Sequence, residues 1–221
     1  MQINASSHIR NRLQKLMFYL FMRCALVIKT ILMLSLLFWG GNLAAEEKQV
    51  TKETDTTKIL FLFENEKEII LWNSVNDNVM GGLSQGKVSY TQDSCLNFSG
   101  LISLDNNGGF SSIRTMPDNY RLGDYEGIKI KLKGDGRTYQ FRIRTDRNFD
   151  GVSFTQEFNT AINEWIEVKL PFSEFLPTFR GRILENEKPL DPEEIKQLGF
   201  LIGDKIEGPF SLIVGKIEAY R

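Results

Sequence analysis

The sequence predicts an all-β domain, either a β-sandwich or a barrel, and two features indicate this class. Apolar and polar residues alternate with a period of two in many short segments, as in strands that bury one face. Glycine, asparagine and aspartate, which favour turns, separate these segments. About ten short strands with turns between them are typical of a sandwich or a barrel.

The clearest alternation lies in residues 128–133 and 139–144. The first segment alternates isoleucine and leucine with lysine, and the second alternates apolar residues with glutamine and arginine. A glycine-containing turn at 134–136 separates them, so we predict two antiparallel strands joined by this turn. Further strand candidates are residues 59–63, 68–72, 87–91, 96–104, 110–115, 152–158, 165–170, 200–202 and 210–217.

One short helix of one or two turns is predicted from Asp191. This aspartate is a favourable N-cap, Pro192 suits the first helical position, and a glutamate completes a capping box. Gly199 is a helix stop signal. The buried side of the helix is expected to consist of Ile195 and Leu198.

Residues 1–45 have the three-part pattern of a secretory signal peptide: basic residues without acidic ones, an apolar stretch at 31–39, and small residues that end at Ala45. We predict an exported protein, periplasmic or secreted, with cleavage after Ala45. Two alternatives stay open. One is an uncleaved membrane anchor, which Lys29 interrupts. The other is a mitochondrial transit peptide, although such peptides lack a concentrated apolar block.

The rest of the chain divides into a linker and a domain. Residues 46–58 are rich in threonine, lysine and glutamate and lack aromatic residues, which is typical of a polar linker. Residues 59–221 form the predicted β-sandwich domain, long enough for one hydrophobic core. Without residues 1–45 the chain has 22 basic and 28 acidic residues, which excludes the basic surface of a typical nucleic-acid-binding protein. Membrane contact is expected only through the N-terminal segment.

The scarce residues argue against several kinds of enzyme. The single histidine is His8, and the two cysteines are Cys24 and Cys95. The domain therefore has no imidazole for a Ser-His-Asp or Cys-His site and too few ligands for a zinc site. Cys95 has no disulfide partner within the domain. We expect no enzyme activity and no cofactor, although a glycanase with two carboxylates stays open as a weaker hypothesis.

Residues 146–157 match the calcium-loop pattern D-x-N-x-D-G-x5-E. Both flanks alternate as strands, whereas an EF-hand loop lies between helices. At about 3.3 Å per residue, an extended chain places Glu157 roughly 20 Å from Gly151. We therefore favour a polar turn and predict no metal site. The weaker alternative is a partial calcium loop that consists of Asp146, Asn148 and Asp150.

Two pairs of glycines and two tryptophans have a structural and a functional interpretation. The pairs at 81–82 and 108–109 lack the lysine and the helix of a phosphate loop, so we predict turns or close backbone approach. Trp72 and Trp165 fit a sugar-stacking platform or a core, and we favour the core.

The arginines are the remaining candidates for a binding surface. Arg142 and Arg144 share the strand face opposite the apolar residues, which fits either a solvated face or a binding surface. Arg180 and Arg182 lie in a predicted loop at 178–182, and loops often carry function.

Four strings of the sequence resemble motifs of the complex I intermediate-associated protein 30 family. They are VNDNVMGGLS at 75–84, SLDNNGGF at 103–110, RIRTD at 142–146 and PTFRGR at 177–182. Gly199, Asp204-Lys205 and Gly208-Pro209-Phe210 fit the end of the family pattern, and the resemblance extends from about Phe61 to Ile217.

This resemblance implies a jelly-roll β-sandwich of the galactose-binding-domain-like type. Mitochondrial members of the family act as assembly factors or chaperones for respiratory complex I and are not enzymes. The family has no established catalytic residues to transfer to this sequence. The candidate binding surface offered by its motifs is Asn76, Asp77, Met80, Arg142, Arg144 and Arg180.

We therefore expect an exported, non-catalytic β-sandwich that binds a protein partner as an assembly or chaperone-like factor, with respiratory-complex assembly components as candidate partners. The alternative is a carbohydrate-binding module of the galactose-binding-like type, favoured by the export signal and the two tryptophans. The third hypothesis is the two-carboxylate glycanase.

Overall fold

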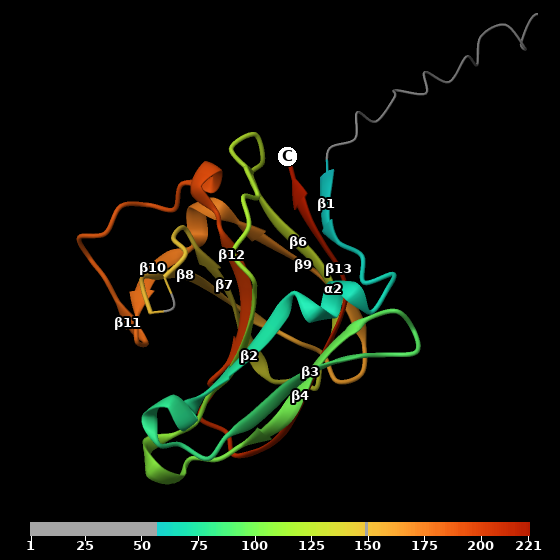
Figure 1. Ribbon diagram of the computed structural model, residues 1–221, viewed down its shortest axis with the longest axis vertical. Coiled ribbons are helices and arrows are strands. Elements are labelled where there is room, and N and C mark those ends of the chain that lie inside the picture. The colour runs from blue at the N-terminus through green and yellow to red at the C-terminus, as the bar shows by residue number, and fades with distance from the viewer. Residues whose placement is uncertain (1–56, 149) are drawn as a thin grey trace, which may run out of the picture. The chain divides into compact units, whose positions relative to one another are not determined.

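The computed structural model describes residues 57–148 and 150–221. In this part of the chain, two antiparallel sheets pack face to face as a β-sandwich (Figure 1), as the sequence predicts, and one short α-helix lies at residues 67–70 and not at the predicted position. The predicted signal segment at 1–45 and the linker residues 46–56 lie outside the described residues. The first strand begins at Thr57, two residues before the predicted start of the domain.

Thirteen strands make up the sandwich in the part that the structure describes. In chain order they are β1 Thr57–Phe61, β2 Trp72–Asn76, β3 Gln85–Tyr90, β4 Leu96–Ile102, β5 Ser111–Thr115, β6 Gly127–Lys133, β7 Thr138–Arg144, β8 Ser153–Asn159, β9 Trp165–Pro171, β10 Leu176–Phe179, β11 Arg182–Ile183, β12 Gln197–Ile202 and β13 Gly208–Tyr220. The helical elements are the α-helix α2 Lys67–Ile70 and the 3-10 turns η1 Asp77–Met80, η2 Asp105–Asn107, η3 Phe172–Glu174 and η4 Pro192–Glu194.

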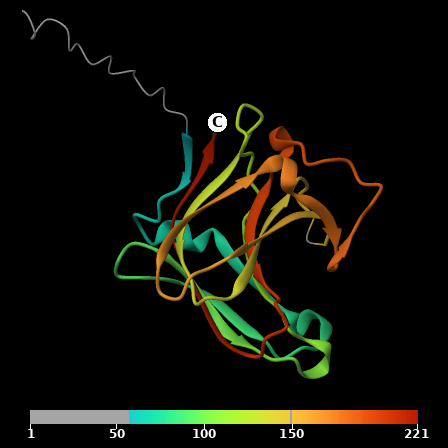
Figure 2. The same cartoon turned by 180° about the vertical axis from the view of Figure 1, so that it is seen from behind.

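The long strand β13 is the centre of the six-stranded sheet, whose order is β3-β4-β13-β6-β9. The first half of β13 pairs with β4, its second half pairs with β1, and its other edge pairs with β6. The N-terminal strand therefore lies beside the C-terminal end of the chain in both views (Figures 1 and 2). The seven-stranded sheet has the order β11-β10-β8-β7-β12-β5-β2, so β7 and β12 lie inside it.

The core lies between the two sheets. Ile128, Ile130 and Leu132 of β6 are buried on one side, and the alternate residues of β7, an aromatic pair and an isoleucine, are buried on the other. Aromatic contacts join the strands, such as the edge-to-face pair of Phe141 and Phe200, whose ring centroids are 5.1 Å apart. The period of two thus has the predicted cause, one buried face per strand.

The strands at 128–133 and 139–144 do not form the predicted hairpin. β6 belongs to the six-stranded sheet and β7 to the seven-stranded sheet, so residues 134–136 cross from one sheet to the other. Alternation indicates one buried face, and this holds equally for strands that pair and for strands that face each other. Asp135 fixes the crossing, because its carboxylate accepts hydrogen bonds from Tyr139 Oη and the Ser211 amide.

The predicted strand at 68–72 is also wrong. Residues Lys67–Ile70 form the α-helix α2, and β2 begins only at Trp72. The helical turn places the Glu68 carboxylate under the chain that leaves β1, where it accepts the amide N–H groups of Leu62 and Phe63. A side chain that binds nearby backbone in this way favours a turn over a strand.

The helix predicted from Asp191 is a single 3-10 turn, η4. Its predicted N-cap is confirmed, since the Asp191 carboxylate accepts the amide N–H of Glu193 at 3.0 Å. Gly199 does not end a helix. It lies inside β12, where a Cβ atom would approach the carbonyl oxygen of Ile113 in β5 to 2.6 Å. Glycine is therefore needed at this position for close strand approach.

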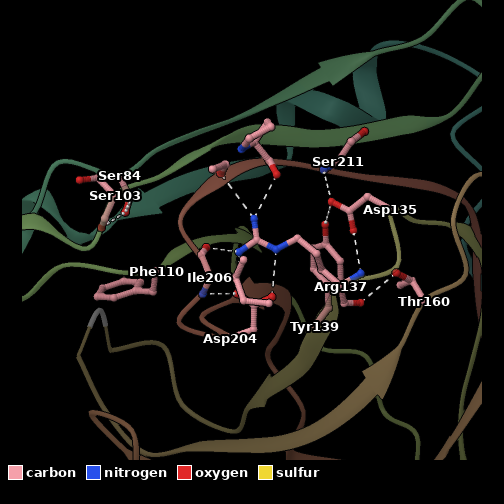
Figure 3. A network of polar contacts seen from close by, with 12 residues as sticks. Ser84, Ser103, Phe110, Asp135, Arg137, Tyr139, Thr160, Asp204, Ile206 and Ser211 are labelled. Carbon is pink, nitrogen blue, oxygen red and sulfur yellow. Dashed lines mark hydrogen bonds and ion pairs between the residues drawn. The ribbon is translucent and has the colours of Figure 1, made fainter.

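A buried ion pair joins two loops at one end of the sandwich. The Arg137 guanidinium contacts both carboxylate oxygens of Asp204, at 2.9 and 2.6 Å, and the two side chains are only 10% and 8% exposed. The same guanidinium donates to the carbonyl oxygen of Ile206 (Figure 3) and to that of Pro209. One arginine thus holds the turn that leads into β13 against the start of β7.

We expect Arg137→Gln to lower the free energy of unfolding by roughly 3 kcal/mol, because it leaves the Asp204 carboxylate buried without its charged partner. Arg221→Gln is the matched control. It removes an exposed pair with Asp124, which contributes less than about 0.5 kcal/mol. Urea unfolding of the three proteins measures both effects, and equal losses for the two variants would contradict the structural role of Arg137.

Candidate functional site

The predicted site residues fall into two separate groups. Asn76 is in register with Ser111, Ile202 and Tyr139 across the seven-stranded sheet. Arg142 lies three residues further along β7, about 10 Å from that row, and on the opposite face of the sheet. The structure therefore does not combine the predicted residues into one surface.

Asp77 is a fully buried carboxylate in η1 that holds two backbone segments. Its Oδ1 accepts the amide N–H of Ser84 at 2.9 Å, and its Oδ2 accepts those of Gly109 at 2.7 Å and Phe110 at 3.3 Å. Charge-assisted hydrogen bonds of this kind are strong and directional. Asp77 therefore reaches a partner only through the loops that it positions.

Asn76 links the two sheets. Its side-chain amide donates to the Gly86 carbonyl and accepts the Gly86 amide N–H at 3.0 Å, as a neighbouring strand would. Its Oδ1 also accepts the Ser111 hydroxyl at 2.7 Å. The side chain thus connects β2 of one sheet with β3 of the other.

The two motif strings at 75–84 and 103–110 lie against each other. Ser84 Oγ accepts the Ser103 amide N–H and donates to the Ser103 carbonyl, and Figure 3 shows this pair.

The glycines of these two strings have the predicted conformational roles. Gly81 and Gly109 have φ angles of +89° and +119°, and a Cβ atom on Gly82 or Gly108 would meet the Asp77 carboxylate. Met80, in contrast, is 68% exposed at the tip of this loop pair.

The second group contains Arg142 and Arg144 on the outer face of β7, and the structure adds Arg114 of β5. Arg114 and Arg142 are both in register with Gly199, which lies between them on β12. Gly199 has no side chain, so nothing on β12 separates the two arginines at this point. Arg144 lies in the next outward position of β7, beside Gln197.

Sequence analysis did not identify Arg114, although one signal was present. Arg114 alternates with Ile113, whose side chain is buried, so it faces outward on a predicted strand. Its proximity to Arg142 depends on the pairing of β5, β12 and β7, and sequence alternation does not state strand order.

The hydrogen-bond partners of Arg142 and Arg144 within the described residues are neutral groups. Arg142 Nη2 donates to Ser153 Oγ at 2.6 Å, and Arg144 Nη1 donates to the Gly151 carbonyl at 2.8 Å. Arg142 Nε is buried and has no hydrogen-bond partner among the described residues. An unpaired buried donor costs free energy, so it needs an explanation beyond stability.

The three guanidinium groups influence one another. Burial, together with the charges of Arg144 and Arg114, lowers the pKa of Arg142 to about 10. Burial and the Arg144 charge also lower the pKa of Arg114, although Asp150 acts in the opposite direction. For Arg144, burial lowers the pKa, while Asp146 and Asp150 oppose this effect. The grouping of these three positive charges on partly buried side chains thus costs free energy.

Aliphatic side chains extend this surface toward the sheet edge. Arg142 is in register with Thr155 of β8, which is in register with Leu176 of β10, and Leu176 is 50% exposed. Ile183 of β11, 60% exposed, follows in the next row beside Thr178. We call this surface the arginine face; it consists of Arg114, Arg142, Arg144, Thr155, Leu176 and Ile183.

The predicted loop at 178–182 is a tight hairpin, in which Arg180 and Gly181 form a two-residue turn. β10 and β11 pair on either side of Arg180 and Gly181, whose φ angles are +48° and +78°, as in a type I′ turn. The exposed Arg180 guanidinium forms an ion pair with Asp150 at 2.6 Å and lies over the ring of Phe179. Arg180 thus borders the arginine face without joining its central row.

The predicted calcium loop has the polar turn that we favoured. Asp146 Oδ1 accepts the amide N–H of Asn148, which is an Asx turn. The Arg180 guanidinium competes with any cation for Asp150, and Glu157 accepts a hydrogen bond from Gln140 on β7. The partial calcium loop stays the weaker hypothesis, and among the described residues no three His, Cys, Asp or Glu side chains gather as a metal site requires.

The two tryptophans lie in different environments. Trp72 is buried, with its ring centroid 5.9 Å from that of Phe200, so the core prediction is confirmed for it. Trp165 is 44% exposed on β9, and the ammonium groups of Lys131 and Lys133 lie 5.6 Å from its ring centroid. The two rings belong to different sheets and do not form one platform.

Cys95 is buried, and its Sγ donates to the Asp93 carbonyl. Burial raises the pKa of its thiol. No helix of residues 57–148 or 150–221 has the length and apolar character of a membrane span.

This arrangement of two antiparallel sheets defines a galactose-binding-like β-sandwich. Solved structures with the same fold include a family 11 carbohydrate-binding module from Clostridium thermocellum, with a TM-score of 0.57 and 17% identity over 74% of this chain and 95% of that chain. An agarase also matches, with a TM-score of 0.53 and 12% identity over 75% of this chain and 25% of the enzyme. At such low identity these similarities establish the fold alone.

Sequence comparison establishes the family. The profile described as complex I intermediate-associated protein 30 matches residues 61–214, so the chain belongs to this family. The mitochondrial complex I intermediate-associated protein 30 of Mus musculus is 26% identical over 186 residues, which cover 75% of this chain and 57% of the mouse protein. The probable counterpart of Caenorhabditis briggsae is 30% identical over 102 residues, which cover 44% of this chain and 30% of that protein.

The chain thus spans between about a third and just over half of these relatives. Both are named as mitochondrial proteins, which agrees with the alternative that sequence analysis left open for the N-terminal segment. None of the comparisons supports export.

We expect Asp77→Asn to lower the free energy of unfolding by about 2 kcal/mol, because one of its two acceptor oxygens becomes a donor that faces buried N–H groups. Asp105→Asn, an exposed change in the facing loop, is the control with little effect. Urea denaturation measures both.

The same variants test a pH dependence. Burial acts to raise the pKa of Asp77, but its hydrogen bonds from Ser84, Gly109 and Phe110 outweigh this and lower the pKa below its ordinary 3.8. The stabilisation is therefore complete above 3.8 and is lost as the pH falls through the lowered pKa. The difference in the free energy of unfolding between wild type and Asp77→Asn should therefore become smaller below about pH 4. A constant difference would contradict the assignment.

Proposed function

We propose that this domain is a non-catalytic protein-binding module with an assembly-factor role, and that its partner contacts the arginine face of the seven-stranded sheet. The observation that carries the proposal is the grouping of Arg114, Arg142 and Arg144 on one sheet face, continuous with exposed aliphatic side chains at the edge. Arginine flanked by apolar surface is the composition that protein interfaces favour.

Family membership supports the same proposal. The relatives are named for their association with an intermediate of complex I, so a partner among the subunits of a respiratory complex is the first candidate for this chain. Because the chain spans just over half of the mouse relative, the partner and the role of the whole protein are part of the proposal.

The arginine face suits a protein better than a neutral glycan. Sugar rings typically stack on exposed aromatic side chains. On the face that carries the arginines, the described residues of β5, β12, β7, β8 and β10 include none, because Phe179 at the end of β10, 36% exposed, alternates with Thr178 and points to the other face. Trp165, the exposed tryptophan, lies on the other sheet beneath two lysines. We therefore place the carbohydrate-binding hypothesis second.

Localisation follows from the N-terminal segment, where we keep export as the proposal and mitochondrial import as the alternative. N-terminal sequencing of the chain purified from its own cells tests this. A mature chain that begins at Glu46 and is found outside the cytoplasm supports export. A chain recovered inside mitochondria would overturn it.

A steric block tests the binding surface. Thr155 lies at the centre of the arginine face, and we expect Thr155→Trp to abolish recovery of a crosslinked protein partner. Ser99→Trp is the matched control, since Ser99 lies on the outer side of β4 in the other sheet, and its partner recovery should equal that of wild type. Affinity purification after crosslinking, followed by mass spectrometry, measures recovery. No defined partner for wild type, or equal recovery for all three proteins, would contradict the proposal.

A further inference from the structure

We infer that the arginine face recognises an acidic, aliphatic peptide segment of the partner, with a carboxylate seated between Arg114, Arg142 and Arg144 and an aliphatic side chain against Leu176. This inference deepens the proposed function and rests on it. It names the chemistry of the segment that binds, which neither the family nor the fold specifies.

The first argument is the form of the positive charge. A guanidinium has a planar set of N–H donors that matches the two oxygens of a carboxylate. Arg142 uses Nη2 for Ser153 and leaves Nε without a partner in the described part of the chain. Arg144 uses Nη1 for the carbonyl of Gly151, a neutral group. Arg142 and Arg144 therefore keep donor capacity and positive charge that a carboxylate satisfies.

The second argument is the distribution of the protein's own carboxylates. Asp150 is engaged by Arg180 at the rim, and Asp146 accepts the amide N–H of Asn148 within its turn. Glu157 accepts a hydrogen bond from Gln140, further along the sheet. These three carboxylates thus have hydrogen-bond partners other than Arg142 and Arg144, while Asp150 also acts electrostatically on Arg114 and Arg144. An anion from a partner complements this arrangement.

The third argument distinguishes a peptide from an acidic polysaccharide. The row that begins with Arg114 and Arg142 continues through Thr155 to the half-exposed Leu176, and Ile183 follows beside it. Aliphatic side chains at the end of a basic row offer contact area for leucine, isoleucine or valine of a peptide. A polyuronate has no such groups, so the combination favours a segment with both acidic and aliphatic residues.

The row also sets the spacing of the peptide residues. Arg142 and Leu176 are separated by two strand spacings, about 10 Å at roughly 4.8 Å each. An extended peptide covers this distance in about three residues. The inferred segment therefore carries an aliphatic residue about three positions from an aspartate or glutamate.

Selection from a displayed library of random peptides of about 12 residues tests the inference, because a segment of that length spans the whole row. We expect wild type to enrich peptides with an acidic and an aliphatic residue at the stated spacing. Arg142→Gln with Arg144→Gln should weaken binding of the enriched peptides by about 10- to 30-fold. Arg142→Lys, which keeps the charge and loses the planar fork, should weaken it less.

The matched control is Lys131→Gln with Lys133→Gln. It removes the same charge from the outer face of the other sheet and should leave peptide binding unchanged. Circular dichroism and thermal unfolding establish that each variant is folded, and the Arg142→Lys protein keeps the test valid if the double arginine variant does not fold.

The outcomes separate the inference from the proposed function. Three outcomes would overturn the acidic-peptide inference. They are enrichment of neutral or basic peptides, equal weakening of peptide binding by the lysine control, and binding of polygalacturonate in place of peptides. If Thr155→Trp still blocks capture of the protein partner in those cases, the proposed function stands without the acidic-peptide inference. If wild type captures no partner and enriches no peptide, both fail.

Discussion

The constraint on which the structure depends is that β7 buries one of its faces in the sandwich. Tyr139, Phe141 and Ile143 are fully buried against the opposite sheet, so the intervening Arg142 and Arg144 must face outward. β7 is also an inner strand, paired with β8 on one side and β12 on the other. The arginines therefore lie in the middle of a rigid sheet, where their positions are set by core packing and by the ladder of hydrogen bonds.

One end of the sandwich is held together by a different means. Asp77 holds the two loops that carry the strings at 75–84 and 103–110, and Arg137 holds the turn before β13 through Asp204. These buried charges are costly unless they are fully paired, and both are paired with several groups. The loop motifs at 75–84 and 103–110 thus have a structural role at this end, whereas the arginine face lies further along the seven-stranded sheet.

Sequence analysis could predict the all-β class, most strands and the outward direction of Arg142 and Arg144, because each depends on a period of two within one segment. It could not predict that β6 and β7 lie in different sheets, since both arrangements bury the same residues. For the same reason it could not place Arg114 beside Arg142, which requires the order β5-β12-β7. Asp77 gave no sign of burial in the sequence, because its partners are backbone N–H groups of a loop about thirty residues away.

The most direct test of the central claim is to map where the partner or an enriched peptide contacts the domain. Backbone amide chemical shifts of the isotopically labelled domain, followed during titration by NMR, report this residue by residue. The account predicts that the perturbed amides cluster at Arg142, Thr155 and Gly199 on the seven-stranded sheet, while Ser99 and Lys131 on the other sheet stay unchanged. Perturbations centred on Ser99 and Lys131, or confined to the loop at Met80, would contradict it.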